Sequence, residues 1–520
     1  MTPLWFKGAH LSPSPSGTLL ACIVFDQLRI CFTSTPQRCI DFPTRVAAKD
    51  VLGLRWAPDS SRIMVLAAAQ IEIIDLEDEQ NRARLENGSS GFGRFSTADF
   101  LQPDQVLTVW EFGRAKIWNL SSGQSVDIDN IKTSIDGPRW SVRPATASTR
   151  AVVAYLSRPA ADDLLIIQFP GDAVALPSIK LPTVDARSLH WSPDGRWLVV
   201  LDCPRQTSNV HIFTPDGHLY KTYPSHNDAD DIGLGVKAVA WSPTSQALAI
   251  SYHSGSIDLI SGRTLSQTAV IEHSTVIAQN EDSEHTTVWQ ECVSASFVRS
   301  YTKLSTPVSP PVSRTKVTHE PREIGVTEAI FDCSGKYIAS RDESMLSTVW
   351  IWDTQELRPQ AVIIQHSNVR RMRWHPKTSS LLLIGCGENI VYLFDVKSGD
   401  GPQHIVVAAN GNANFSFSGS DDESNTVLAT TKVGFSLLRT AEQTPAPGHR
   451  TSGEALRDMV DQEDSLFEIL SGRANIDFSH TEQLELDAAA QEGTVRLDDT
   501  FDGRKKHSII HDPLDDSEIF

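Results

Sequence analysis

Several features that would point to an enzyme or a membrane protein are missing from this sequence. The chain has 520 residues, and no apolar run approaches the roughly 18 residues that a membrane-spanning helix needs. It contains no phosphate-binding Gly-x-x-x-x-Gly-Lys loop, no Gly-x-Gly-x-x-Gly fingerprint, no His-Glu-x-x-His helix and no Gly-x-Ser-x-Gly elbow. We therefore expect no catalytic residues, no cofactor, no metal ion and no small-molecule substrate.

Cysteine and positive charge are also scarce. The seven cysteines are odd in number and scattered, and no Cys-x-x-Cys pair occurs, so they predict neither a disulfide framework nor a zinc site. The chain carries 46 Lys and Arg against 65 Asp and Glu, a formal net charge of −19. Nucleic acids and anionic membranes both require a basic face on the protein that binds them. We expect a soluble cytoplasmic protein that binds neither.

What the sequence does contain is a phrase that returns at a nearly fixed interval. The clearest copy is Trp191-Ser-Pro-Asp-Gly-Arg-Trp-Leu198. Full or degraded copies begin at Leu11, Trp56, Phe100, Trp140, Trp191, Trp241, Phe331, Trp374 and Phe417. Successive starts lie 40 to 51 residues apart, except for one gap of 90 residues. A period near 45 residues is typical of the blades of a β-propeller.

The residues between copies read as short strands. In 235–241, 247–252 and 256–260, apolar residues alternate with polar or small ones, and each run ends in Pro, Gly, Ser or Asp. The sequence therefore predicts an all-β WD-repeat β-propeller over residues 1–440, with about nine recognisable units arranged as one or two propellers.

Aspartates and tryptophans recur at fixed places in this repeat. Asp59, Asp194 and Asp353 stand at turns and strand ends, where an aspartate usually caps backbone amides, so we do not interpret them as a catalytic acid pair. The repeated tryptophans, such as Trp191 and Trp374, are expected to pack between blades.

The gap of 90 residues leaves two interpretations open for residues 262–322. One is a degenerate blade near Thr286–Gln290 with a disordered portion attached, which we favour; the other is a Ser/Pro-rich insertion. Thr306-Pro307 and Ser309-Pro310 lie here and suit proline-directed kinases, so Thr306 and Ser309 are candidate phosphosites. The alternative is that they are simple linker composition.

Beyond residue 440 the repeat stops and the chain becomes acidic. Residues 441–520 contain 19 Asp/Glu and 7 Lys/Arg, which predicts a mostly disordered tail. Thr451-Ser-Gly-Glu454 is a capping box for a short amphipathic helix over 452–471. Its apolar face would dock in a groove of a partner or fold back on the propeller, and comprises Leu456, Met459, Val460 and Phe467.

A basic cluster, Arg370, Arg371 and Arg373, stands just before the copy at Trp374. Strand alternation places Arg371 and Arg373 on one side and Arg370 on the other. The three arginines form either an acid-recognising patch at the propeller rim, where a partner binds, or solvated strand ends.

Several stretches resemble one WD-repeat family in particular. They are 235–250 with Gly255-Ser-Ile-Asp258, Ile338-Ala-Ser-Arg-Asp342 followed by Val349-Trp-Ile-Trp-Asp353, Trp374-His-Pro376, and Tyr392-Leu-Phe394. They are similar to the WD-repeat protein eight family of spindle-pole and centrosomal proteins. The resemblance covers roughly residues 5–440 and is strong over 185–400.

This resemblance implies a non-enzymatic adaptor on the cytoskeleton, at the spindle pole body or centrosome. Its implied partners are a coiled-coil microtubule-anchoring protein, a minus-end-directed kinesin-14 and other spindle-pole or centrosome components. With them it would anchor microtubule minus ends and organise the mitotic spindle. The resemblance maps no binding residues onto this sequence.

The main alternative is a substrate receptor of a cullin-type ubiquitin ligase. Such receptors commonly end a blade with Trp-Asp-x-Arg, whereas the best match here, Trp352-Asp-Thr-Gln355, has glutamine in place of arginine. We therefore rank this function below the adaptor.

Overall fold

The computed structural model describes residues 5–78, 80–87, 93–132, 139–144, 152–169, 177–203, 209–223, 235–277, 286–305, 307–312, 325–387, 389–407, 413–418 and 426–439. The chain divides into two compact units, Met1–Gln443 and Thr444–Phe520. The second unit holds none of the described residues. The predicted helix over 452–471, with Leu456, Met459, Val460 and Phe467, therefore lies outside the described residues, as does Thr306.

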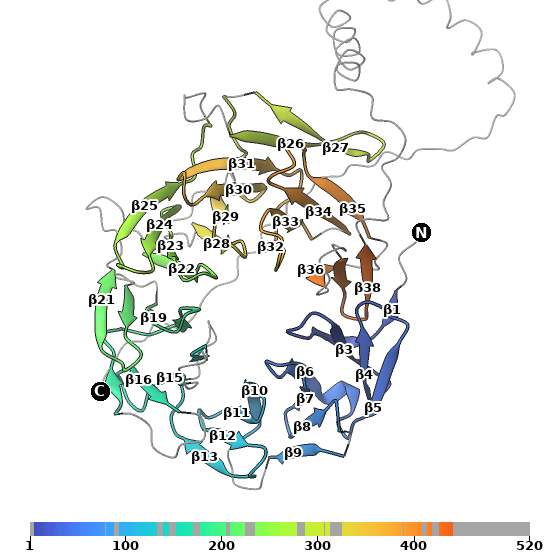
Figure 1. The fold of residues 1–520 in the computed structure, drawn as a ribbon, viewed down its shortest axis with the longest axis vertical. Helices are drawn as coiled ribbons and strands as arrows, with labels where there is room; N and C mark the ends of the chain where they lie inside the picture. The colour runs from blue at the N-terminus through green and yellow to red at the C-terminus, as the bar shows by residue number, and fades with distance from the viewer. Residues whose placement is uncertain are drawn as a thin grey trace, which may run out of the picture. The chain divides into compact units, whose positions relative to one another are not determined.

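The first unit is built from nine β-sheets that follow one another around a ring (Figure 1). In seven of the sheets the four strands are hydrogen-bonded in sequence order and antiparallel, from an inner first strand to an outer last strand. We number the sheets as blades 1 to 9; blade 9 takes its outer strand from the start of the chain, and the sheet of blade 7 has two further strands. Blade 1 comprises β2 Ala9–Pro13, β3 Leu19–Val24, β4 Gln27–Phe32 and β5 Cys39–Pro43, and blade 2 comprises β6 Val51–Trp56, β7 Arg62–Ala67, β8 Gln70–Asp75 and β9 Arg82–Glu86. Blade 3 comprises β10 Phe95–Gln102, β11 Gln105–Trp110, β12 Ala115–Asn119 and β13 Ser125–Ile128, and blade 4 comprises β14 Trp140–Val142, β15 Val153–Ser157, β16 Leu164–Gln168 and β17 Ile179–Lys180. Blade 5 comprises β18 Ser188–Trp191, β19 Leu198–Leu201, β20 Val210–Phe213 and β21 Leu219–Tyr223.

Blades 6 to 9 complete the ring. Blade 6 comprises β22 Val236–Trp241, β23 Ala247–Tyr252, β24 Ser256–Ser261 and β25 Gln267–Glu272, and blade 7 comprises β28 Val326–Phe331, β29 Tyr337–Asp342, β30 Thr348–Asp353 and β31 Arg358–Ile364. Blade 8 comprises β32 Arg371–Trp374, β33 Leu381–Gly385, β34 Ile390–Asp395 and β35 Gln403–Val406. Blade 9 comprises β36 Asn414–Ser418, β37 Thr426–Thr430, β38 Gly434–Arg439 and β1 Phe6–Lys7. Two 3-10 turns, Ala48–Asp50 and Glu343–Met345, lie between strands, and no helix in the described part of the chain is long and apolar enough to cross a membrane.

The two ends of the repeat array meet in blade 9, which closes the ring. Strand β1 pairs with β38, Phe6 lies opposite Phe435, and the two rings stack with their centroids 5.2 Å apart. Buried apolar residues form nine clusters, one between each pair of neighbouring blades, including Leu20 and Leu428 between blades 1 and 9. The predicted all-β propeller of about nine units is confirmed, and it is one ring of nine blades.

The recurring phrase forms the turn between the first and second strand of a blade. In blade 6 the amide of Ser245 donates to the carbonyl of Ser242 at 2.8 Å, and Ser245 has a φ of 60°. The equivalent residues of other copies, Gly195 and Gly335, have φ of 68° and 75°. Glycine recurs at this place because the turn needs a left-handed backbone, which costs other L residues free energy.

The aspartates and tryptophans of the phrase behave as expected. The side chain of Asp194 accepts a hydrogen bond from the amide of Arg196 at 3.1 Å, so this aspartate caps its own turn. The indole N–H of Trp191 donates to the carbonyl of Ser141, on the inner strand of the preceding blade, at 3.1 Å. The tryptophan therefore joins neighbouring blades by a hydrogen bond as well as by packing.

One face of the ring carries the linkers between blades together with the turns between second and third strands. Because the strands alternate in direction, these segments share one end of every blade, which we call the linker face. The turns are bonded to the linkers there: in blade 1 the carboxylate of Asp26 accepts a hydrogen bond from Ala48, in the linker to blade 2, at 2.5 Å. The opposite end, which we call the back face, carries the remaining turns.

The described residues of 262–322 do not form a separate blade. Strands β26 (Thr287–Val293) and β27 (Arg299–Leu304) form a hairpin, and β26 pairs in parallel with β31, so the hairpin extends blade 7 to six strands. The buried carboxylate of Glu291 lies 2.8 Å from Arg299 and accepts the hydroxyl hydrogen of Tyr392 in blade 8 at 2.7 Å. The degenerate blade that we favoured is wrong, because these strands pair with a complete blade.

Candidate functional site

The three arginines predicted to bind an acidic partner lie together on blade 8. Arg370 ends the linker from blade 7, and Arg371 and Arg373 lie on the inner strand β32. All three side chains are exposed, whereas Met372 between them is fully buried. Within the described part of the chain, no guanidinium group of the three makes a hydrogen bond or an ion pair.

A cavity of about 210 Å³ opens beside Arg370 and Arg371. Its wall is the backbone of Gly385 and Gly387, and Phe415 of blade 9 contributes apolar surface. Gly387 has a φ of 81°, and a Cβ atom there would lie 2.5 Å from Cδ of Arg370. Glycine is therefore needed at 387 for the Arg370 side chain to lie across this turn. The cavity has room for one or two side chains of a partner.

One acidic residue, Glu328 on the inner strand of blade 7, interacts electrostatically with Arg371 and Arg373. Burial raises the pKa of Glu328, and the charges of Arg341, Arg373 and Arg371 offset only part of that effect. The arginine site, which we define as Arg370, Arg371 and Arg373, carries three positive charges against this one carboxyl group, so it keeps a net positive charge and can accept a carboxylate or phosphate group.

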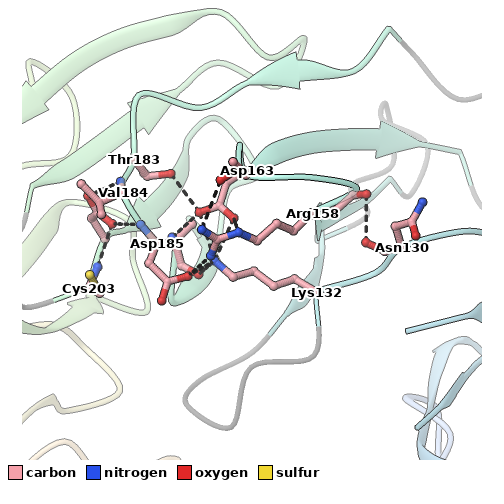
Figure 2. A network of polar contacts seen from close by, with 12 residues as sticks. Asn130, Lys132, Arg158, Asp163, Thr183, Val184, Asp185 and Cys203 are labelled. Carbon is pink, nitrogen blue, oxygen red and sulfur yellow. Dashed lines mark hydrogen bonds and ion pairs between the residues drawn. The ribbon is translucent and has the colours of Figure 1, made fainter. Parts of the chain in front are cut away.

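A second group of charged residues lies on the linker face between blades 3, 4 and 5 (Figure 2). Nζ of Lys132 lies 2.9 and 3.0 Å from the two carboxylate oxygens of Asp163, 2.6 Å from Asp185 and 2.7 Å from the carbonyl oxygen of Ala186. Arg158 also reaches Asp185, at 2.5 Å. Burial alone would raise the pKa of Asp185, but hydrogen bonds and charge from Lys132 and Arg158 outweigh it and lower the pKa.

This group is structural rather than a binding site. Its two cations face two carboxylates, so no net charge is left for a ligand. Lys132 belongs to the linker into blade 4, Asp163 to a turn of blade 4, and Ala186 to the linker into blade 5, so the contacts fix three neighbouring segments. The cluster was not predicted from the sequence, since 31 residues separate Lys132 from Asp163 and no repeat phrase marks either.

Four residues of blades 6 and 7 form a second buried network that the sequence analysis missed. Oγ of Ser340 lies 2.8 Å from Nε2 of His273 and accepts the indole N–H of Trp352 at 2.9 Å. Nδ1 of His273 lies 3.6 Å from Asp342. The network joins the linker of one blade to two strands of the next, so these residues hold the repeat together. Ser340, Asp342 and Trp352 lie in the repeat stretches 338–342 and 349–353, but nothing local in the sequence links them to His273, which is 67 residues before Ser340.

The remaining predicted site residues can be placed only in part. Ser309 is exposed, but the next residue, Pro310, is buried, and Val308 is bonded to Ile277 through both of its backbone groups. A proline-directed kinase reads the proline as well, so Ser309 would need local opening to become a substrate. Among the described residues, no cluster of three or more His, Cys, Asp or Glu side chains could hold a metal ion.

The ring of nine sheets defines the class of fold, an all-β propeller, and the relatives that the chain matches are WD repeat-containing proteins. The chain is 25% identical over 412 residues to the mouse WD repeat-containing protein WRAP73, which covers 73% of this chain and 83% of that protein. It is 24% identical over 344 residues to a WD repeat-containing protein of Schizosaccharomyces pombe, covering 64% of this chain and 67% of that protein. The similarity to WD-repeat proteins expected from the sequence is thereby confirmed.

The chain was also compared with protein-family models and with solved structures. No protein-family model matches the chain. A crystal structure of the eukaryotic initiation factor aligns with a TM-score of 0.51 over 77% of this chain and 88% of that chain, at 12% identity. A likeness at this identity shows the propeller fold alone.

Proposed function

We propose that this protein is a non-enzymatic adaptor at the spindle pole body or centrosome. It joins a coiled-coil microtubule-anchoring protein to a minus-end-directed kinesin-14, together with other pole components, and so anchors microtubule minus ends and organises the mitotic spindle. The similarity to WRAP73 over 412 residues supports a WD-repeat scaffold. The location and the partners rest on the family resemblance of residues 185–400.

The observation that carries the adaptor proposal is the arginine site. Three exposed guanidinium groups stand on one blade of a strongly acidic protein, and within the described residues none makes an ion pair. The fold has no need of three such unpaired charges, whereas recognition of an acidic partner segment does. Charge complementarity of this kind increases the rate of association and selects among partners.

Tagged protein recovered from mitotic cells, with partners identified by mass spectrometry and the fusion imaged in living cells, tests this function. We expect a coiled-coil anchoring protein and a kinesin-14, with signal at spindle poles. Arg370→Glu with Arg371→Glu should lose at least one of them. Arg263→Glu changes an exposed arginine on the back face and should lose neither. A diffuse signal, or recovery of a ubiquitin-ligase adaptor instead, would contradict the proposal.

A further inference from the structure

Exposed apolar side chains gather on the linker face of four consecutive blades. Phe25 is 90% exposed, Phe112 74%, Val433 68% and Leu52 55%. Phe25, Phe112 and Val433 stand in second-to-third-strand turns of blades 1, 3 and 9, and Leu52 is the second residue of β6 in blade 2. We call these four residues the apolar arc.

The two faces of the ring differ in this respect. Val184 and Val276 are also exposed on the linker face, in linkers farther around the ring. At the back-face end of the blades, Leu357 is 44% exposed in a turn, and Ile40, Leu219 and Tyr220, near the start of outer strands, are 41%, 46% and 58% exposed, all less than Phe25, Phe112 and Val433. Single exposed apolar residues are ordinary, but a concentration on one face of a soluble protein marks an interaction surface.

The backbone at Phe25 is not explained by folding. Phe25 and Asp26 have φ of 48° and 60°, the conformation of a type I′ turn, which favours Asn-Gly. A bulky side chain in the left-handed region is strained. Because the ring of Phe25 is almost fully exposed, its burial does not offset the strain.

The turns of the arc are held in place by hydrogen bonds. Asp26 is bonded to the linker before β6 through its carboxylate, which accepts from Ala48, and through its carbonyl, which accepts the hydroxyl of Thr44 at 3.2 Å. The carbonyl of Val433 accepts the amide of Gly8 at 3.1 Å. Aromatic and aliphatic groups on fixed turns lose little conformational entropy when a partner binds.

The charges beside the arc indicate the partner's chemistry. Arg45 and Lys49 lie in the linker to blade 2, Arg94 in the linker to blade 3, and Lys432 beside Val433; all four are exposed. None of these four side chains makes an ion pair within the described residues. The neighbouring acids are Asp26, Asp50 and Glu111. Asp26 and Glu111 accept backbone amides but keep their charges, so the four cations exceed these acids by one. Local positive charge in a chain of net charge −19 is complementary to an acidic partner.

We propose that the apolar arc is a docking surface for an acidic amphipathic segment of a partner protein. The apolar side of that segment packs on Phe25, Leu52 and Phe112, and its carboxylates face Arg45, Lys49 and Arg94. This surface lies on blades 9, 1, 2 and 3, whereas the arginine site lies on blade 8. The inference therefore goes beyond the proposed function, and it holds whether or not the protein acts at spindle poles.

Fluorescence anisotropy of the full chain with a labelled synthetic peptide tests the proposal. The probe is a helix-forming peptide of about six turns with leucines on one face and glutamates elsewhere. Phe25→Asn removes the aromatic ring and also relieves the strained turn. We expect it to weaken binding by about tenfold or more, as loss of a central aromatic group does, while the thermal midpoint stays the same or rises.

The chain supplies a matched control. Phe297 is 85% exposed, has a φ of 61°, and stands at the tip of the hairpin β26–β27. Phe297→Asn should therefore raise or preserve the thermal midpoint in the same way but leave binding unchanged. Because neither variant is expected to lose stability, a loss of binding that is specific to Phe25→Asn cannot come from misfolding.

Four results would overturn the proposal. They are failure of the wild-type chain to bind the probe, equal binding by Phe25→Asn, equal binding of a peptide with lysine in place of glutamate, and equal binding of a peptide with scattered leucines. Sedimentation of the chain alone supplies a further test. Self-association that Phe25→Asn abolishes would identify the arc as an interface between copies of this chain and would also overturn it.

Discussion

Replacing Lys132 with methionine is expected to be among the most destabilising single changes in this protein. The substitution removes the ammonium group that contacts both carboxylate oxygens of Asp163 at 2.9 and 3.0 Å. Asp163 is fully buried, and the amide of Ala186, at 2.6 Å, is one of the few donors left to it. Breaking a buried ion pair by removing one partner typically costs about 3–5 kcal/mol.

Hydrogen exchange of the amides in β15, β16 and β18 measures this effect where it arises. A loss of about 3–5 kcal/mol corresponds to exchange faster by roughly two to three orders of magnitude, because 1.4 kcal/mol is about tenfold. Adding Asp163→Asn should recover most of the loss, since the amide oxygen still accepts from Ala186 but carries no charge.

The exposed ion pair between Lys180 and Asp162 is the matched control. Its atoms lie 2.7 Å apart, but its side chains are 68% and 59% exposed, so Lys180→Met should cost less than about 1 kcal/mol. If Lys132→Met exchanges no faster than Lys180→Met, the cluster in Figure 2 does not hold the blades together, and the reasoning is refuted.

Three further changes have defined outcomes. Burial lowers the pKa of His190 from 6.5 to about 4, so the unfolded chain takes up a proton between these pH values while the folded protein does not. Stability should therefore fall by roughly 3 kcal/mol from pH 6.5 to 4, and denaturation of His190→Gln should lack this part of the loss. Gly387→Ala should displace Arg370 and reduce partner recovery as Arg370→Glu does, at a cost of about 1–2 kcal/mol from the left-handed backbone, read as a lower thermal midpoint. Leu456→Ala with Phe467→Ala should weaken partner binding and leave the propeller's thermal midpoint unchanged; equal binding would dispose of the predicted tail helix as a docking element.

The repeated phrase allowed the ring to be predicted because it encodes a local structure. Asp194 caps its own turn, and the left-handed residue of that turn recurs at Ser60, Ser245 and Gly335. The nine starts, from Leu11 to Phe417, match the nine blades. The number of rings was left open because closure depends on Phe6 meeting Phe435, and nothing local in either segment records that contact.

The elements that escaped prediction depend on distant contacts or on backbone strain. The hairpin β26–β27 was interpreted as a degenerate blade because its strand pattern is ordinary, and only its pairing with β31 distinguishes it. His273 and Ser340 are 67 residues apart in the chain. Phe25 carried no turn signal, since a phenylalanine in a type I′ turn contradicts the usual preference for Asn-Gly.

The arginine site was predicted in part. The cluster is visible in the sequence, and alternation placed Arg371 and Arg373 on one side of a strand, where both are exposed; Arg370, placed on the other side, ends the linker and is exposed as well. The cavity was not foreseeable, because it depends on Gly387 and on Phe415 from the next blade. Its role in partner binding stays a prediction.

Reconstitution from purified proteins tests the adaptor function most directly. The chain is mixed with a coiled-coil anchoring protein and a kinesin-14 recovered from mitotic cells, and the mass of the complex is measured by light scattering. The account predicts one complex containing all three proteins for the wild-type chain and for Arg263→Glu, and loss of at least one partner from Arg370→Glu/Arg371→Glu. Failure of the wild-type chain to join the two partners, or an unchanged complex with the arginine-site variant, would contradict it.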